Sequence, residues 1–223
     1  MTRPDRDTRA PAPGLTGTGL VADDLYLMAH HEVTGKPLLQ PRAAGLGLAG
    51  ALLAELALAG VIGLWQGQVA LADAARPADG LARDVLDVLV REAQPHPVRD
   101  WLAFLGRTAA GDVARRLERS GYLTCARRSW RGQRWVPVNA DCAFAPIARV
   151  KSALNPARPV TAQGAVLAGL AVACGLGSRL ALYLPPDALR RVDVTAGQLD
   201  PGLHGLIAQT QAAVDSALLA HRA

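Results

Sequence analysis

Aromatic residues, cysteine and lysine are scarce in this 223-residue chain, and each scarcity narrows the choice of fold and function. Aromatic side chains make up only 4% of the residues, so leucine, alanine and valine must fill the core that a 50% hydrophobic composition provides. Cys125, Cys142 and Cys174 are far apart and form no CxxC pair, which argues against a disulfide framework or a zinc site. They favour a reducing compartment. Lysine occurs only at Lys36 and Lys151, so arginine supplies nearly all of the positive charge.

The first residues also lack the apolar run of a secretory signal. Residues 1–19 mix arginine with aspartate and then continue with prolines and glycines. Such a composition buries too little apolar surface to fold. We therefore expect a disordered arm at 1–19, a single domain at 20–223 and a cytoplasmic location. The abundance of arginine, alanine and glycine is typical of GC-rich genomes and favours a bacterial source.

One long apolar run, at residues 43–65, contains a single charge, Glu55. Its length allows a membrane span, which needs about 20 apolar residues. Alanine and glycine supply much of the run, however, and make it only weakly hydrophobic. We expect a soluble helix at 43–59, buried at the centre of the domain, and keep a membrane span as the weaker alternative. The leucines expected to be fully buried on this helix are Leu48, Leu52 and Leu56.

Hydrophobic periodicity predicts a mainly α-helical fold with short β-hairpins. Further helices are expected at 80–93, from Val98 through Leu105, and at 109–120, 145–154, 161–177 and 203–221. Residues 21–31 fit a helix or a strand. Hairpins are expected at 61–73, around Gln66–Gly67, and at 122–138.

Three local patterns suggest a cofactor, metal or catalytic site, but none has the surrounding residues that such a site requires. GLGLAG at 45–50 fits the GxGxxG pattern, but a dinucleotide site needs a preceding strand, and the spacing here favours close helix packing. His30, His31 and Glu32 have no further ligand spaced to complete a metal site. Ser178 lacks the GxSxG spacing of a nucleophile elbow. We therefore expect no cofactor, no metal and no enzymatic activity.

Positive charge is concentrated in residues 107–151. This segment holds ten basic residues and three acidic ones, a local excess of +7 that exceeds the +5 of the whole chain. Trp130 and Trp135 lie within it. Arginines beside tryptophans suit an anionic interface, where guanidinium groups bind phosphate and indoles lie at the boundary. The alternative is an ordinary solvated arginine surface.

Three stretches in order resemble the Golgi phosphoprotein 3 family, which includes bacterial members. LAGALLAELALAGVIGL at 48–64 is similar to its central buried helix. DVLVREAQPHPVRDWLAFL at 87–105 resembles its helix–proline–helix segment, and VARRLERSGYLT at 113–124 resembles the helix that enters its β-hairpin. The order and spacing agree over about 21–220.

The resemblance implies a mostly helical, non-catalytic domain. Eukaryotic members bind phosphatidylinositol 4-phosphate through one tryptophan and three arginines, and act as adaptors for glycosyltransferases. The tryptophan corresponds to a position near Gln40, and the arginines correspond to Ala49, Arg107 and Ala110. Only Arg107 matches the pattern. Arg42 lies near the first two positions and is a possible substitute, so Arg107 and Arg42 are the predicted headgroup-binding residues.

The family's hairpin, proposed to mediate self-association and membrane contact, corresponds to about 122–138. Its candidate residues here are Arg127, Arg128, Trp130, Arg131, Arg134 and Trp135. The sequence thus predicts a peripheral membrane protein that binds anionic, phosphoinositide-like headgroups, with possible protein clients. Two alternatives remain: nucleic-acid binding by the basic helix and hairpin, as in a winged helix, and a purely structural interaction protein.

Overall fold

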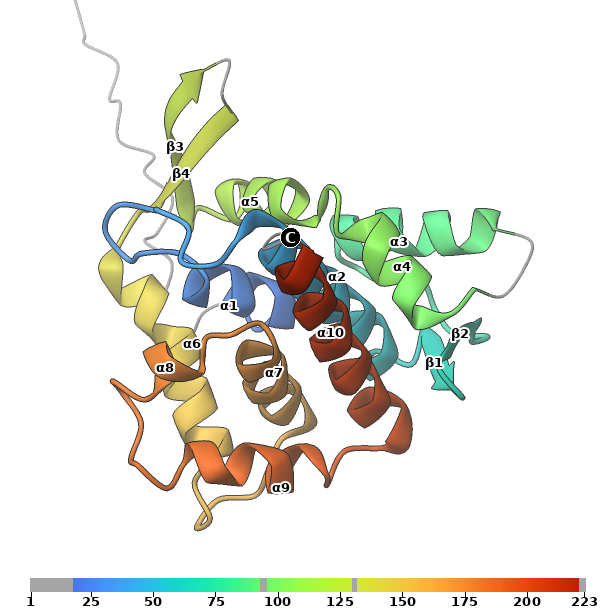
Figure 1. The fold of residues 1–223 in the computed structure, drawn as a ribbon. Coiled ribbons are helices and arrows are strands. Elements are labelled where there is room, and N and C mark those ends of the chain that lie inside the picture. Colours follow the sequence, from blue (N-terminus) through green and yellow to red (C-terminus); the bar gives the residue numbers. More distant parts are fainter. Residues whose placement is uncertain (1–17, 93–95, 130–131, 221–223) are drawn as a thin grey trace, which may run out of the picture.

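The computed structural model describes residues 18–92, 96–129 and 132–220, and within them the fold is mainly α-helical, as expected (Figure 1). The helices are α1 (Val21–Met28), α2 (Pro41–Leu58), α3 (Gly80–Arg91), α4 (Val98–Leu105), α5 (Ala109–Arg119), α6 (Ala140–Ala153), α7 (Ala162–Ala173), α8 (Gly177–Leu180), α9 (Val192–Ala196) and α10 (Pro201–Ala220). The strands are β1 (Ile62–Trp65), β2 (Gln68–Leu71), β3 (Leu123–Ser129) and β4 (Gly132–Pro137). Most of the arm expected at 1–19 lies outside the described residues.

Helix α2 is the central element, which confirms the prediction for 43–59 (Figure 1). It runs antiparallel to α10 and packs against α1, α4, α5 and α7 as well. Leu48, Leu52 and Leu56 are at most 3% exposed. In the part of the chain that the structure describes, α2 is the one helix long and apolar enough to cross a membrane, but 72% of that window is buried inside the protein.

The GLGLAG stretch lies inside α2, where its glycines form close helix contacts. A Cβ atom on Gly45 would collide with the backbone carbonyl of Gly106, just after α4. A Cβ on Gly47 would collide with the Cys174 thiol at the end of α7, and one on Gly50 would collide with Thr210 on α10. The motif therefore allows three neighbours to approach the central helix, as the helix-packing interpretation predicts.

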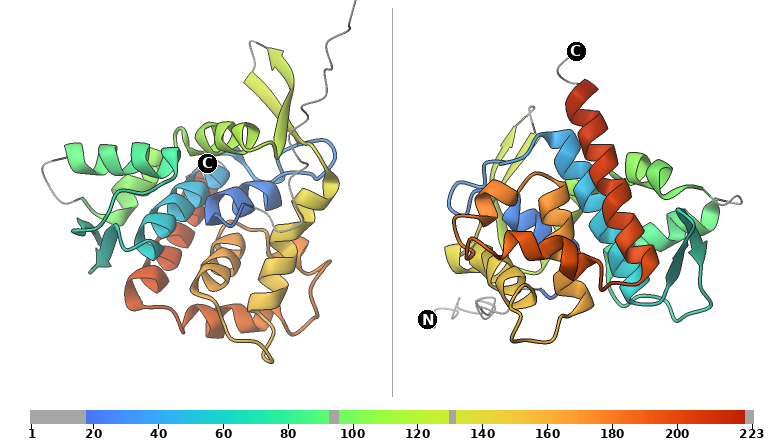
Figure 2. Two further views of the ribbon diagram at one scale, coloured as in Figure 1. Left: turned by 180° about the vertical axis from the view of Figure 1, so that it is seen from behind. Right: turned by 60° about the horizontal axis from the view of Figure 1, so that its bottom comes forward.

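The two hairpins lie on different sides of the helical body (Figure 2). In β1–β2, Gln66 and Gly67 have φ values of 48° and 76°, the left-handed conformation that a two-residue hairpin turn requires. In β3–β4, the antiparallel register is irregular between Cys125 and Arg127. Both hairpins occur where they were predicted.

Some element boundaries differ from the sequence prediction. Helix α6 begins at Ala140 and not at 145, because Asn139 caps it by accepting a hydrogen bond from the Asp141 N–H at 2.9 Å. Pro146 lies within this helix, on its buried side. The ambiguous segment 21–31 is a helix over Val21–Met28. Helix α7 ends at Ala173 and is followed by the short helices α8 and α9, which periodicity did not reveal.

Candidate functional site

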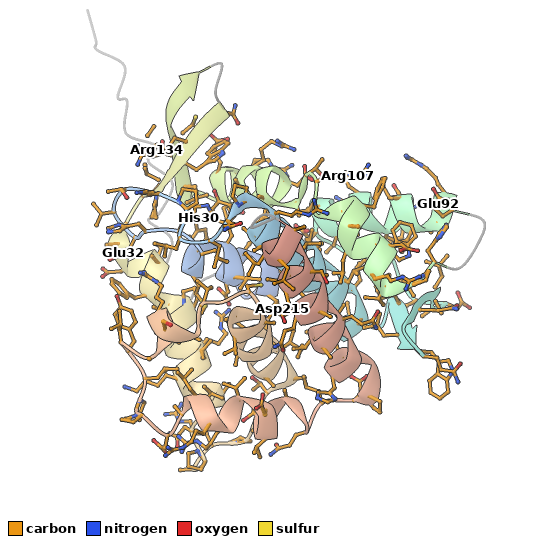
Figure 3. All side chains as sticks on the ribbon, in the orientation of Figure 1. His30, Glu32, Glu92, Arg107, Arg134 and Asp215 are labelled. Atoms are coloured by element: carbon orange, nitrogen blue, oxygen red, sulfur yellow. The ribbon has the colours of Figure 1, made fainter. Side chains whose placement is uncertain are left out.

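Arg42 and Arg107, the two predicted headgroup-binding residues, line the same cavity. Arg42 lies in the first turn of α2, and Arg107 follows α4. The cavity has a volume of about 470 Å³. It is lined by Pro41, Arg42, Leu46, Ala103, Gly106 and Arg107, and we call it the arginine pocket. Figure 3 shows Arg107 at the junction of α4 and α5.

The contact between Gly45 and Gly106 positions this pocket. A Cβ atom on Gly45 would lie 2.2 Å from the Gly106 carbonyl oxygen. A Cβ on Gly106 would lie 2.7 Å from the Leu102 carbonyl oxygen and 3.2 Å from the Gly45 backbone. Arg42 precedes Gly45 by three residues, close to one helical turn, and Arg107 directly follows Gly106. The close approach of the two backbones therefore brings both guanidinium side chains to one cavity.

The electrostatics of the arginine pocket favour an anion. In the part of the chain that the structure describes, no carboxylate lies within ion-pairing distance of Arg42 or Arg107. Pro41 is the first residue of α2, so the positive end of the helix dipole opens at the same place. The N–H groups of a first helical turn have no partner within the helix and are suited to an anionic oxygen.

The other positions that correspond to the family's lipid pocket contribute no charge here. Ala49 is fully buried, Ala110 is half-buried, and Gln40 is exposed immediately before α2. Arg42 and Arg107 are the two basic residues that line the arginine pocket.

The hairpin residues fall into two groups, and Trp135 corrects an expectation. Trp135 is only 8% exposed and belongs to the hydrophobic core, so its indole stabilises the base of the hairpin and does not face outward. Arg134 is exposed, and its Nε donates a hydrogen bond to the Thr34 carbonyl at 3.1 Å. Arg127 and Arg128 lie in β3, paired with Arg134 and Gln133. Trp130 and Arg131 lie outside the described residues.

A buried ion cluster, which the sequence did not predict, joins four elements behind this face. The Arg116 guanidinium, on α5, has a side chain that is only 4% exposed. Its Nε donates to Asp23 Oδ1 at 2.7 Å, and Nη1 donates to Glu55 Oε2 at 2.9 Å and to Asp79 Oδ1 at 3.0 Å. Asp79 also caps α3 by accepting from the Ala82 N–H at 2.8 Å. The cluster thus fixes α5 against α1, α2 and the start of α3.

Burial is the largest influence on the pKa values of the two most buried carboxyls in this cluster. Burial raises the pKa of Asp23 and the pKa of Glu55 above their ordinary values, although Arg116 opposes the shift at both. Burial alone would lower the pKa of Arg116, but the charges of Glu55, Asp23 and Asp79 outweigh it and raise that pKa. The guanidinium therefore stays charged, while the carboxyls of Asp23 and Glu55 bind a proton more readily than they would in water.

Arg116 and Arg149 count toward the +7 segment, but they do not belong to an exposed basic surface. Arg149, on α6, pairs with the buried Asp24 and is 22% exposed. Two features of the sequence could have revealed Arg116. Glu55 is the one charge in the apolar run at 43–65 and needs a cation when it is buried. Arg116 lies beside Val113 and Leu117 on the buried face of α5.

The His-His-Glu stretch provides local structure. His30 is largely buried, lies within 2.7 Å of the Tyr26 carbonyl and stacks on the Tyr26 ring. The pKa of His30 is lowered by burial. His31 Nδ1 accepts a hydrogen bond from the Val33 N–H at 3.2 Å, and Glu32 pairs with Arg179 at 2.7 Å. Among residues 18–92, 96–129 and 132–220, no group of three potential ligands could hold a metal ion.

Comparison with known proteins identifies the family. The model of the family described as Golgi phosphoprotein 3 (GPP34) matches residues 21–217. No match was found among curated proteins. The family match spans the central helix, the arginine pocket, the ion cluster and the β3–β4 hairpin. Because it covers most of the 223 residues, the chain belongs to the Golgi phosphoprotein 3 family.

Proposed function

We propose that the protein binds anionic lipid headgroups at the membrane surface, and that this binding rather than catalysis is its activity. The observation that carries the proposal is the arginine pocket, where Arg42 and Arg107 line one cavity beside the N-terminus of α2. A phosphate group gains charge-assisted hydrogen bonds from guanidinium groups held in this way. Family membership supports a lipid-binding, adaptor-like role in general terms.

The β3–β4 hairpin supplies additional, less selective attraction in this proposal. It carries Arg127, Arg128, Arg131 and Arg134 and projects from the helical body on the side where α5 lies (Figure 1). Each basic residue near an anionic membrane contributes about 1 kcal/mol to binding. Four arginines therefore hold the domain on the surface whatever the headgroup, and the arginine pocket adds local recognition. The hairpin is also our proposed site of self-association.

With two basic residues in the pocket, we expect weak selectivity among anionic lipids. Binding to vesicles should fall steeply with salt and rise with anionic content, with little preference for phosphatidylinositol 4-phosphate over other anionic lipids. Flotation of the full chain with vesicles of matched charge measures this. Strong selectivity for phosphatidylinositol 4-phosphate that disappears with Arg107→Ala alone would overturn our assignment of the dominant contribution to the hairpin.

Variants separate the hairpin from the pocket. Replacing Arg127, Arg128, Arg131 and Arg134 by alanine should weaken vesicle binding more than Arg107→Ala does. A matched control replaces four exposed arginines elsewhere, namely Arg76, Arg83, Arg158 and Arg190. This control loses the same net charge, so it should bind more tightly than the hairpin variant. Equal loss in the two fourfold variants would mean that net charge alone, and not a defined surface, governs binding.

Nucleic-acid binding is the competing function, because α5 leads into a basic hairpin as a winged helix does. The geometry weakens this alternative, since Arg116 turns inward to the ion cluster and leaves the exposed face of α5 with fewer basic groups. Duplex DNA binding and vesicle flotation at the same salt concentration distinguish the two functions. Tighter binding to DNA than to anionic vesicles would overturn the lipid proposal.

A further inference from the structure

A second cavity adjoins the arginine pocket and shares two of its residues, Ala103 and Arg107. Its volume is about 360 Å³. The residues that line it and bear on its chemistry are Glu92, His96, Asp100, Trp101, Phe104 and Arg107. We call it the aromatic–acidic cavity. Because the two cavities meet at Arg107, a single small ligand can reach both.

Local structure explains how these side chains gather. Four lining residues share one side of α4 and of the turn that follows it: Asp100, Ala103, Phe104 and Arg107. The last three lie three, four and seven residues after Asp100, which is the spacing of one helical face. Trp101 is 6% exposed, and its ring meets the Phe104 ring edge-on at a centroid distance of 6.2 Å. Phe104 itself is 50% exposed. The cavity therefore has a fixed aromatic wall with one ring open to solvent.

The two cavities differ in charge. The arginine pocket is lined by Arg42 and Arg107, whereas the adjoining cavity has the carboxylates of Glu92 and Asp100. Each carboxylate has a neighbouring nitrogen-bearing side chain, since His96 Nε2 lies 3.6 Å from Glu92 and Arg99 Nε lies 3.5 Å from Asp100.

Both of these pairs are exposed to solvent, and each carboxylate side chain is 55% exposed. Exposed pairs of this kind are weak and exchange readily for a better partner. The joined cavities therefore present a positive end and a negative end to one ligand.

We infer that the joined cavities take the two ends of a zwitterionic headgroup, an amine-bearing phosphodiester of a membrane lipid such as phosphatidylethanolamine. The phosphate lies between Arg42 and Arg107, and the ammonium lies between Glu92 and Asp100 beside Phe104. This inference rests on the proposed lipid-binding function and names the headgroup class.

The spacing and the donors fit this class of ligand. Asp100 lies in the first turn of α4 and Arg107 lies two residues after its end, and both line the same cavity. A headgroup with a short ethanolamine spacer between its phosphate and its ammonium can therefore contact both residues. Carboxylates accept hydrogen bonds from a primary ammonium, and an aromatic face attracts a cation. Phe104, half-exposed at the rim, is placed to contact the lipid surface.

Vesicle flotation of the full chain tests the inference. One vesicle set holds phosphatidylglycerol at a fixed fraction with phosphatidylcholine as the remainder, and the other replaces the phosphatidylcholine by phosphatidylethanolamine. We expect roughly tenfold tighter binding to the phosphatidylethanolamine set, the gain typical of a charge-assisted hydrogen bond. The double variant Glu92→Gln with Asp100→Asn should lose this gain and still bind phosphatidylglycerol.

A control variant with the same change in net charge replaces two acidic residues outside the joined cavities. Asp84→Asn with Glu118→Gln also removes two acids, from a separate cavity between α3 and α5, and should keep the phosphatidylethanolamine gain. If the gain is absent in the unmodified protein, or is equal in both double variants, the inference is wrong. If phosphatidylglycerol vesicles are not bound at all, the proposed function itself fails.

A second experiment, with soluble headgroup compounds, distinguishes a membrane lipid from a free metabolite as the ligand. Calorimetric titration compares glycerophosphoethanolamine with glycerol phosphate. We expect weak binding that favours glycerophosphoethanolamine and depends on Asp100. Tight binding of the soluble compound without any vesicle binding would contradict our inference that the ligand is a membrane lipid.

Discussion

Arg116 and Arg107 lie only nine residues apart in the sequence, but the first is buried and the second is exposed. Arg116 is buried and donates hydrogen bonds to three carboxylates on three other parts of the chain. Arg107 is exposed at a cavity with Arg42, without a carboxylate partner among the described residues. The first arginine has its partners inside the protein and serves stability. The second lines an open cavity, and we propose that its partner is a bound ligand.

The comparison shows why a local excess of charge does not by itself define an interface. The sequence places both arginines in the +7 segment, where they contribute equally. In the structure, Arg116 and Arg149 are neutralised by carboxylates of α1, α2 and the loop before α3. The basic surface available to a ligand is therefore smaller than the sequence suggests.

Removing the buried arginine should have the largest effect. Arg116→Met leaves three carboxylates without their cation in or near the core, which should lower the free energy of unfolding by about 3–5 kcal/mol. Chemical denaturation measures the loss. The neighbouring Arg115→Met is the control, because Arg115 forms only an exposed pair with Asp112 and should change stability by about 1 kcal/mol or less. Similar losses in the two variants would contradict the assignment of Arg116 to stability.

Truncating a buried leucine of the central helix should have the next largest effect on stability. Leu52 is 3% exposed on α2, and Leu52→Ala should destabilise the fold by about 2–5 kcal/mol through lost burial and the space left behind. Vesicle binding by the remaining folded protein should be unchanged, because Leu52 lies ten residues from Arg42 along the same helix. Denaturation and flotation on the same sample measure both effects, and a loss below 1 kcal/mol would mean that this part of α2 is not tightly packed.

The ion cluster should also give stability a distinctive pH dependence. Above the ordinary pKa values of 3.8 for Asp23 and 4.5 for Glu55, and up to their raised values, the folded protein holds protons that the unfolded chain has released. The free energy of unfolding contributed by these groups therefore falls as pH rises, by at most about 1.4 kcal/mol per pH unit for each extra proton.

Glu55→Gln isolates this contribution and should make the fall with pH shallower. The comparison with the unmodified protein is necessary because His30 acts in the opposite sense. Its pKa is lowered by burial from 6.5, so its contribution to stability is lost as pH falls. Denaturation curves between pH 4.5 and 7.5 measure the difference in slope, and identical slopes in the two proteins would exclude a proton held at Glu55.

The arginine pocket should have the smallest effect on stability. Arg42→Ala and Arg107→Ala each remove an exposed side chain without an internal partner, so the free energy of unfolding should change by about 0.5 kcal/mol or less. Thermal and chemical denaturation of both variants provide the measurement. A loss comparable to that of Arg116→Met would show that these arginines hold the fold together, and the contrast between the two regions would be lost.

Much of the fold could be predicted from local sequence pattern. Gly60 and Gly121, which follow α2 and α5, have φ values of 69° and 78°, the left-handed conformation that commonly ends a helix. Gln66–Gly67 forms the predicted hairpin turn. These features depend on a few neighbouring residues. The start of α6 was predicted too late, since the helix begins at Ala140, directly after its cap Asn139.

The candidate site was predictable only in part. Arg107 was identified by resemblance and Arg42 by its nearness to the corresponding positions, and the structure places both at one cavity. Trp135 was assigned to an outward-facing hairpin surface, but strand alternation and the neighbouring loop at 31–36 turn it into the core. The aromatic–acidic cavity was not predicted, because Glu92 follows α3 whereas Asp100 lies in α4, and no sequence spacing relates them.

The sequence by itself determined the helical class, the central apolar helix and the turns, because each follows from periodicity, composition or the conformational freedom of glycine within a short segment. Only the tertiary structure decided which charges are satisfied internally and which remain for a ligand. Asp23, Glu55, Asp79 and Arg116 are separated by up to 93 residues, and their hydrogen bonds exist only once four elements have packed. Arg42 and Arg107 likewise line one cavity only in the folded protein, where Gly45 allows α2 to touch the backbone of Gly106.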